Sequence, residues 1–536
     1  MEQEKSFMGV EQLSLRGLIL GIIGSIIVTS GSMYAALKIG MVPWPTVFAA
    51  ILCIAVLKLL GKTTKNEINI AQSAMTAGAM IAAGLGFTAP GLWKIDENLD
   101  MFKYFWILLG ISFVGLLMGL LLTWVWRNML LKKENLPFPI GIATAKTIES
   151  GEKIGIKTLF LVLSLLISGA FTTIRDWFMK IPSFINFKFL EKYNIQSGAY
   201  MSPLALAIGY MVGPLYTLVL FIGAVFGFVL LVPLGINFGL FSSIEAGNSV
   251  RETIGLGLMV GAGFGVIIKF IIDGIKNRKN KQKSESKFKL KNTRIGLLVC
   301  AISFAICILV GLSPIISILV LIGIFLTSLM ASLITGQTGI DPLEIFGILV
   351  MITIRAIIPS ISTEVALLIA GIVAIASGFV GDVMFDYKTG EIFGTNPKAQ
   401  LIAQAVGGIV GAIIASFTIF IMIKAYGPVS SPSLPAVQAN IVFGMISSSF
   451  DPVIFWSAAA IGASLYILKV PSTTLGIGIY LPFGMSLTIF AGGAIKFIVD
   501  KFWKKQSDNG MIVASGIFGG ESLVGIIIAF IFLLTA

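Results

Sequence analysis

Apolar runs close to 20 residues long alternate with short polar segments along the whole chain. A helix needs about 20 apolar residues to cross the ~30 Å hydrocarbon core of a bilayer. Unpaired backbone cannot face lipid, and these runs are too long and continuous for the strands of a membrane barrel. The pattern therefore predicts an all-α polytopic membrane protein. The clearest runs are Leu15–Leu37, Val42–Leu60, Phe105–Trp126, Phe160–Ile174, Leu215–Val232, Ile254–Ile272, Ile295–Leu312, Ile315–Ile334, Ile345–Ile358, Val365–Val380, Ala399–Ile423 and Met511–Leu534.

When the shorter segments that Pro or Gly interrupts are counted as well, we expect about 14–16 crossings. The composition agrees, since 56% of the 536 residues are hydrophobic, 12% are charged and the mean hydropathy is +0.97. Soluble domains carry roughly 25% charged residues, so a soluble globule is excluded. We expect no cleavable signal peptide, because the start is charged and the first apolar run is too long.

The net charge of +12 is concentrated in one segment. Residues 276–294 hold nine basic residues and one acid, and the positive-inside rule places such a cluster in the cytoplasm. Residues 94–103 are net acidic, which is typical of an external segment. We therefore expect the N-terminus and the 276–294 linker to be cytoplasmic, in a protein of the cell membrane. The cluster does not indicate a nucleic-acid partner, and contact with anionic lipid is the alternative to a simple topology signal.

The chain has three cysteines and no histidine. Cys53, Cys300 and Cys307 lie inside apolar runs, where a thiol acts as a small hydrophobic group. Histidine is the commonest metal ligand and the commonest proton relay near neutral pH. Because it is missing, we expect no metal site, no cofactor and no imidazole-based proton transfer.

Two halves of the chain, residues 1–275 and 295–536, resemble each other in the same direction on either side of the 276–294 linker. Ser202–Phe228 resembles Ser472–Phe497, and similar pairs occur in the same order at separations of roughly 260–280 residues. Parallel repeats are common in secondary transporters, whose binding sites lie at the repeat interface. Coincidence between Gly-rich apolar segments is the alternative.

Three segments combine Pro, Gly and hydroxyl side chains at membrane depth: Leu136–Thr147, Ser202–Pro214 and Pro471–Gly484. Proline removes a helix donor and glycine lets backbones approach, so the backbone groups freed there can face a ligand or cation. The segments predict broken or re-entrant helices, with ordinary kinks as the alternative.

One strip departs from the apolar background. Ser377–Gly411 carries Asp382, Asp386, Lys388 and Glu391 between two long apolar runs. A charge at membrane depth costs several kcal/mol and typically lines the path of an ion or substrate. The alternative is a polar loop at the membrane edge with a local ion pair.

The residue types in this strip fit ion-coupled transport. Asp382 and Asp386 are four residues apart, so they share one face of a helix, and two close carboxylates hold one proton more tightly than either alone. Lys388 could neutralise one carboxylate or hold a carboxylate of the substrate. Gln400 and Gln404, also four apart, present amides that can bond peptide groups in either direction.

The same strip resembles the signature region of the oligopeptide transporter (OPT) family, where S-G-D-x-x-x-D-x-K-T-G precedes G-x-x-P-x-x-Q-x-x-A-Q. The segments LSLRGLILG, LPFPIGIATAKTIESGE and ASGIFGGESLVG agree as well, so the resemblance spans nearly the whole chain. The matching positions in the strip are Ser377, Gly381, Asp382, Asp386, Lys388, Thr389, Gly390, Gly394, Pro397, Gln400 and Gln404.

The resemblance implies a secondary transporter for small peptides or metal–chelate complexes, usually driven by protons. We therefore expect a peptide or metal-chelate substrate, H⁺ as the coupling ion, alternating access and no enzymatic activity. The surrounding partner is the lipid bilayer, and a homo-oligomer is left open.

Weaker candidates lie elsewhere in the chain. Glu521 is an isolated acid inside the last apolar run, where a functional role is favoured. Tyr210 and Tyr480 occupy nearly equivalent places in the two halves, where they line a cavity or anchor the chain at the membrane interface.

Two acids have local interpretations. Glu364 and Arg355 flank Pro359, where a structural ion pair across a helix break is the simpler interpretation beside a role at the site. Asp341 precedes an apolar helix that it can cap.

Other functions fit the sequence less well. No G-x-x-x-x-G-K-[ST] loop is present, so the chain has no phosphate loop for an ATP-driven pump. A passive channel stays open, because repeated halves and broken helices occur there too. The least favoured reading is an intramembrane prenyltransferase that holds Mg²⁺-diphosphate on Asp382/Asp386 and Asp96/Asp100, since the second pair lies in a net-acidic external segment.

Overall fold

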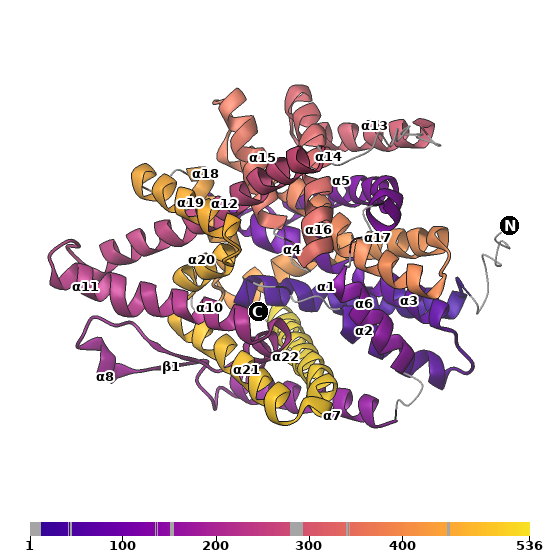
Figure 1. Cartoon of the computed structure of the whole chain (residues 1–536), viewed down its shortest axis with the longest axis horizontal. Helices are drawn as coiled ribbons and strands as arrows, with labels where there is room; N and C mark the ends of the chain where they lie inside the picture. Colours follow the sequence, from indigo (N-terminus) through magenta and orange to yellow (C-terminus); the bar gives the residue numbers. More distant parts are fainter. Residues whose placement is uncertain are drawn as a thin grey trace. The chain divides into compact units, whose positions relative to one another are not determined.

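The computed structural model describes residues 12–40, 42, 46–133, 136, 138–150, 155–278, 293–338, 341, 343–431, 433–447 and 451–535. Helices account for nearly all of them (Figure 1). The prediction of an all-α polytopic membrane protein is confirmed. Most of the predicted linker, 276–294, lies outside the described residues.

The elements of the first half of the chain are α1 (Leu15–Ile39), α2 (Thr46–Leu59), α3 (Lys65–Thr76), α4 (Ala79–Thr88), η1 (Ala89–Lys94), α5 (Met101–Asn128), η2 (Met129–Lys133), α6 (Pro139–Ser150), α7 (Gly155–Thr172), η4 (Thr173–Trp177), β1 (Phe184–Asn186), α8 (Lys188–Glu191), β2 (Gly198–Tyr200), α9 (Pro203–Val212), α10 (Pro214–Val225), η5 (Phe226–Leu231), α11 (Val232–Asn237) and α12 (Ile244–Arg278). Those of the second half are α13 (Thr293–Leu309), α14 (Pro314–Thr338), α15 (Leu343–Ile357), α16 (Thr363–Phe393), α17 (Pro397–Tyr426), α18 (Val437–Ser447), α19 (Pro452–Ile467), α20 (Ser472–Tyr480), α21 (Phe483–Phe502), η6 (Lys504–Gln506) and α22 (Ser507–Thr535).

Ten helices in the described part of the chain are long and apolar enough to cross a membrane, and five shorter apolar helices accompany them. These helices contain most of the apolar runs that the sequence shows. Two spans, Lys65–Lys94 and Phe483–Phe502, are not among those runs, because polar residues dilute their hydropathy. The number of crossings stays a prediction.

The helices form two compact units, and each unit draws on both halves of the chain. Unit 1 comprises Met1–Gly169, Asn292–Ser447 and Ser522–Ala536, and unit 2 comprises Ala170–Lys291 and Ser448–Glu521. The unit boundary at Ala170 recurs at Ser448, 278 residues later (448 − 170), which is also the separation between the starts of α1 and α13 (293 − 15).

In unit 1, α16 is a central helix whose apolar span is entirely buried. It packs against α4, α5, α14 and α15, while α1 packs against α3, α4 and α17. Ser362 caps its N-terminus by accepting a hydrogen bond from the Val365 amide. It ends at Gly394, whose φ of 69° is a left-handed conformation that glycine adopts without a Cβ penalty.

Breaks occur where Pro and Gly predict them. α9 and α10 meet at Gly213, whose φ is 95°, directly before Pro214. α20 and α21 are separated by Leu481 and Pro482. In unit 1, α6 begins at Pro139, after Phe138 with a φ of 43°.

Helix contacts in unit 2 occur in matched pairs. A Cβ added at Gly209 of α9 would lie 1.8 Å from the carbonyl oxygen of Ile489, and one at Gly478 of α20 would lie 1.9 Å from that of Leu220. The second contact repeats the first after a shift of 269 residues (478 − 209 and 489 − 220). The contacts Gly223 to Leu475 and Gly492 to Leu206 are related by the same shift (492 − 223 and 475 − 206). Only glycine allows backbones to approach this closely.

Unit 2 also carries a small hairpin between α7 and α9. β1 and β2 pair antiparallel, with Phe184 opposite Tyr200 and Asn186 opposite Gly198, and α8 lies between them. The side chain of Asn248 on α12 donates to Gln196, which ties the hairpin to that helix.

Candidate functional site

The polar strip of the sequence forms the C-terminal part of α16 and the start of α17. Asp382 and Asp386 lie within the continuous α16 helix, one turn apart, and are 2% and 1% exposed. These two acids therefore do not lie in a loop at the membrane edge. The sequence places them on a helix because no Pro interrupts the chain between Pro359 and Pro397.

Asp386 is held by amide side chains from two neighbouring helices. Gln72 of α3 donates from Nε2 to Oδ1 at 2.8 Å, and Gln404 of α17 donates to Oδ2 at 3.4 Å. Gln400 of α17 donates to the backbone carbonyl of Asp386 at 2.8 Å. Amides that donate to a carboxylate stabilise its charged form without neutralising it.

Asp382 has fewer contacts. Its Oδ1 atom is buried and has no hydrogen-bond partner among the described residues. Asp341, which precedes α15, lies beside it: a Cβ added at Gly381 would lie only 1.9 Å from Asp341 Oδ2 and 2.9 Å from Thr335 Oγ1. Both carboxylate oxygens of Asp341 are buried, and neither accepts a hydrogen bond from an amide of α15 in the described part of the chain; the Thr335 hydroxyl is the polar group beside them. The capping role predicted for Asp341 is therefore wrong.

The last turns of α16 contact α6. Thr389 Oγ1 donates to the Gly141 carbonyl at 2.9 Å, and a Cβ at Gly141 would lie 2.5 Å from the carbonyl oxygen of Phe385. Lys388 pairs with Glu391 at 2.9 Å, one turn beyond the buried acids. The local ion pair considered from the sequence is present at Lys388, while Asp382 and Asp386 take part in no ion pair among the described residues.

This arrangement suits the binding of a small cation. Two carboxylates on one buried face, with no basic partner in the described residues, are stabilised when a proton or another cation neutralises one of them. The amide oxygens Oε1 of Gln72 and Gln404 are also buried without a described partner, so they are available as acceptors. No group of three or more His, Cys, Asp or Glu side chains in the described chain is spaced to hold a metal ion.

Unit 2 contains a buried carboxylate that, unlike those of Asp382 and Asp386, has a basic partner. Glu521 of α22 pairs with Arg175 Nη1 at 3.0 Å, and both side chains are 2% exposed. Ser202 donates to both carboxylate oxygens at 3.0 Å, and the amide of Leu204 donates to Oε2 at 2.7 Å. That amide belongs to the first turn of α9, where the helix dipole also favours an anion. Glu521 thus joins η4, α9 and α22.

Comparison with known proteins identifies the family. The model of the family described as "OPT oligopeptide transporter protein" matches residues 12–532. The chain belongs to the oligopeptide transporter family. It is similar to the "Putative oligopeptide transporter" of Haemophilus influenzae, at 24% identity over 93% of this chain and 92% of the relative. It is also similar to a metal-nicotianamine transporter of Arabidopsis thaliana, YSL3, at 25% identity over 96% of this chain and 90% of the relative.

The other residues predicted for the transporter's site are dispersed. Glu364 accepts from Tyr104 at 2.9 Å, and Arg355 donates to the Ile446 carbonyl, so the structure gives each of these charges another partner. In unit 2, the Tyr210 hydroxyl donates to the Ser507 carbonyl at 3.5 Å, and the Tyr480 carbonyl accepts from Arg251 at 3.0 Å.

The second D-x-x-x-D spacing has a local explanation in this transporter. Asp100 caps α5 by accepting from the amides of Phe102 and Lys103, and Asp96 accepts from the Asn98 amide. These contacts account for both acids without a bound diphosphate.

Sequence reasoning missed two residues that the transporter uses to hold its buried acids. Gln72 lies in α3, which is too polar to stand out as a membrane segment. The signal that could have found it is its spacing, since Gln72 and Thr76 lie one turn apart on the same helix, as Gln400 and Gln404 do. The second residue is Arg175, at the end of an apolar run; it pairs with the adjacent Asp176 as well as with Glu521, and a charge pair at the end of such a run is the signal that could have found it.

Proposed function

We propose that this protein is a secondary active transporter that moves small oligopeptides or metal–chelate complexes across the plasma membrane by alternating access, coupled to H⁺. The observation that carries the proposal is the buried Asp382–Asp386 pair, which has no cation beside it among the described residues. Membership of the transporter family and the names of the two relatives support the substrate classes.

Asp382 and Asp386 are the proposed proton-binding groups. Protonation of one carboxylate removes the repulsion between the two and lowers the cost of burying them. Gln404 and Gln72 keep Asp386 oriented in either state, since an amide can donate to a carboxylate or accept from a carboxylic acid. Gln400, Lys388, Glu364, Glu521, Tyr210 and Tyr480 stay predictions for substrate or ion coupling.

The proposed architecture is a parallel repeat of residues 1–275 and 295–536 joined by the 276–294 linker. The matched contacts of unit 2, with their constant shift of 269 residues, support it. So does the recurrence of the unit boundary in the second half. In such transporters, rocking of the related helix sets exposes a site alternately to the two sides of the membrane.

The proposed topology places the N-terminus and the linker in the cytoplasm, from the nine basic residues of the linker. A proton gradient directed into the cell would then drive uptake.

The decisive experiment is uptake of labelled tripeptides, tetrapeptides and a metal–nicotianamine complex into proteoliposomes, with and without an imposed proton gradient. We expect concentrative uptake only with the gradient. Flux that merely equilibrates the substrate, with the same rate in both conditions, would show a passive channel and contradict the proposal.

A further inference from the structure

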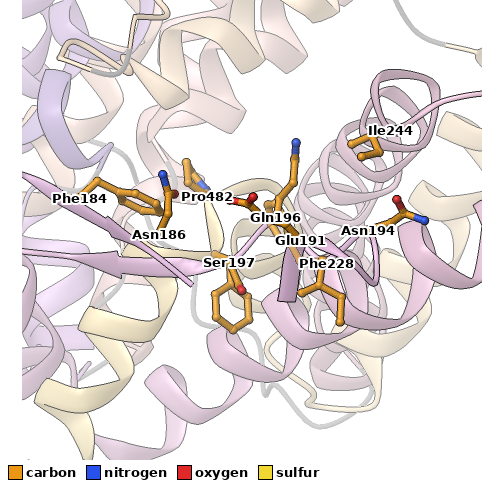
Figure 2. A pocket seen from close by; sticks show the side chains of 11 residues that line it. Phe184, Asn186, Glu191, Asn194, Gln196, Ser197, Phe228, Ile244 and Pro482 are labelled. Atoms are coloured by element: carbon orange, nitrogen blue, oxygen red, sulfur yellow. The ribbon is translucent and has the colours of Figure 1, made fainter. Parts of the chain in front are cut away.

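Unit 2 contains a pocket of about 470 Å³ that the β1–β2 hairpin helps to line. Figure 2 shows the side chains that line it. They come from the hairpin, from η5, from the start of α12 and from the break between α20 and α21. This volume lies in the range of 300–1,000 Å³ that small-molecule sites occupy.

The lining combines aromatic rings with neutral hydrogen-bonding groups. Phe483 supplies apolar surface. So do Phe184 and Phe228, while Asn186 and Ser197 supply polar groups (Figure 2). Ser197 is 6% exposed, and its hydroxyl has no hydrogen-bond partner among the described residues. A buried hydroxyl without a partner costs free energy, so a polar ligand in this pocket would satisfy it.

One end of the pocket favours an anion. Pro482 and Phe483 line it at the N-terminus of α21, a helix of 20 residues, and the side chain of Pro482 cannot cap the helix. The first amides of a helix have no intrahelical partner and carry the positive end of its dipole. Arg251, which is 4% exposed, lies with its guanidinium 4.1 Å from the centroid of the Phe228 ring, but its charge is paired with Glu252 at 3.1 Å, so the helix N-terminus is what favours the anion.

Glu191 supplies the single negative charge among the lining residues. A ligand with a carboxylate at the α21 end, an ammonium group near Glu191 and amide-like groups between them would match this distribution. We propose that the pocket is a capture site for small zwitterions with a free carboxylate, the chemistry that short peptides share with aminocarboxylate metal chelators. The inference rests on the proposed transport function and narrows its substrate class.

The length of α12 indicates the side of the membrane on which the pocket opens. Ile244 lines the pocket and begins α12, and the basic segment follows the other end of the helix at Arg278. A helix of 35 residues spans about 52 Å, more than the ~30 Å hydrocarbon core. Since the basic segment is predicted to be cytoplasmic and the apolar run Ile254–Ile272 of α12 is predicted to cross the membrane, we expect the pocket to be external, where it suits uptake.

The test uses the full chain in intact cells and measures labelling of Asn186→Cys by a membrane-impermeant maleimide. Trialanine and a metal–nicotianamine complex are the two carboxylate probes, and trialanine amide is the matched probe without a carboxylate. We expect the carboxylate probes to slow labelling at least fivefold and the amide to leave it unchanged. Comparing trialanine with the metal–nicotianamine complex shows whether the pocket binds the peptide, the chelate or both. Lys192→Cys, on the hairpin outside the pocket lining, is the control whose labelling no probe should change.

Two further measurements test the capture site without relying on the Asn186→Cys variant. Gln196→Cys should show the same protection as Asn186→Cys. Ser197→Ala, tested in the purified full chain by the rise of melting temperature with trialanine, should weaken binding about tenfold, the effect of losing one hydrogen bond to a charged group.

Equal protection by trialanine and its amide, or no protection and no thermal shift with either carboxylate probe, would overturn the inference. If proteoliposomes transport these substrates while the pocket shows no protection, the proposed function stands and the capture site is wrong. If the pocket is protected but no gradient-driven uptake occurs, the capture site stands and the transport proposal fails.

Discussion

Two buried carboxylate sites show opposite solutions to the same electrostatic problem. Glu521 in unit 2 has a guanidinium, a hydroxyl and a helix N-terminus around it. Asp382 and Asp386 in unit 1 share one face of α16. The amides of Gln72 and Gln404 donate to Asp386, and Oδ1 of Asp382 has no hydrogen-bond partner among the described residues. Both sites are almost inaccessible to water, so burial alone does not separate them.

The difference lies in what each site does when its charge changes. Protonating Glu521 would break one of the two ion pairs of buried Arg175, whose other carboxylate partner is Asp176 at 2.6 Å. Protonating the Asp382–Asp386 pair would remove a repulsion instead. A carboxylate with a basic partner therefore suits a fixed structural contact between helices. Two neighbouring carboxylates without a basic partner suit a site that gains and loses a proton in each transport cycle. The following predictions test this comparison and are ordered by their expected effect on stability.

Arg175→Ala should destabilise the protein most, by about 3–5 kcal/mol, because it leaves Glu521 as an uncompensated buried charge. Denaturant unfolding of the purified protein in detergent measures this. The double variant Arg175→Met/Glu521→Leu should recover part of the loss, since it removes the buried Glu521 charge and leaves only the more exposed Asp176 without its partner. Lys180→Ala, at an exposed lysine, is the control. If Arg175→Ala is as stable as the unmodified protein, the ion pair between Arg175 and Glu521 does not stabilise the fold.

Gly381→Ala should cost about 1–3 kcal/mol, because the added methyl group would overlap the Asp341 carboxylate, 1.9 Å away. Gly378→Ala, one turn earlier on α16, is the matched control: its nearest contact is the Leu343 side chain at 3.1 Å, so the loss should be smaller. Melting temperatures of the two variants distinguish them. Equal values would show that Asp341 moves freely and is not held against Asp382.

Gln400→Leu and Gln404→Leu should each cost about 0.5–1.5 kcal/mol, the net value of one neutral hydrogen bond. They should differ in function. Gln404 contacts the Asp386 carboxylate, whereas Gln400 contacts only its backbone carbonyl. We expect Gln404→Leu alone to change the dependence of uptake rate on proton concentration, as measured in proteoliposomes. The same change in both variants would mean that the amide pair acts only by positioning α16.

Asp382→Asn should leave stability unchanged or raise it slightly, because its Oδ1 has no described partner to lose. It should abolish gradient-driven accumulation while keeping exchange of preloaded substrate, since exchange needs no net proton movement. A stability loss comparable to that of Arg175→Ala would erase the contrast between the two sites. Equal loss of accumulation and exchange would remove the proposed coupling role.

Local sequence patterns predicted what depends on local physics. The apolar runs became helices, and Gly213–Pro214 and Leu481–Pro482 became helix breaks, because hydrophobicity and backbone freedom are properties of short segments. The charged strip was recognised because Asp382 and Asp386 contrast with the residues around them.

The partners of these acids could not be predicted in the same way. Gln72 is 314 residues from Asp386 in the sequence, and nothing in α3 marks the contact. Asp341 had a sufficient local explanation as a helix cap, and only the close approach of Gly381 shows another role. Contacts between helices depend on packing over the whole unit, which a single sequence does not encode in any short window.

The joint between Arg175 and Glu521 also sets an order of events during biogenesis. The two residues are 346 positions apart (521 − 175), so a ribosome that adds about 5–20 residues per second reaches the acid roughly 17–70 s after the base. Throughout that interval Asp176, the next residue, is the partner already available to the guanidinium, and the carboxylate that joins it to the last helix is missing. Release of a finished unit 2 from the insertion machinery therefore has to await the final helix.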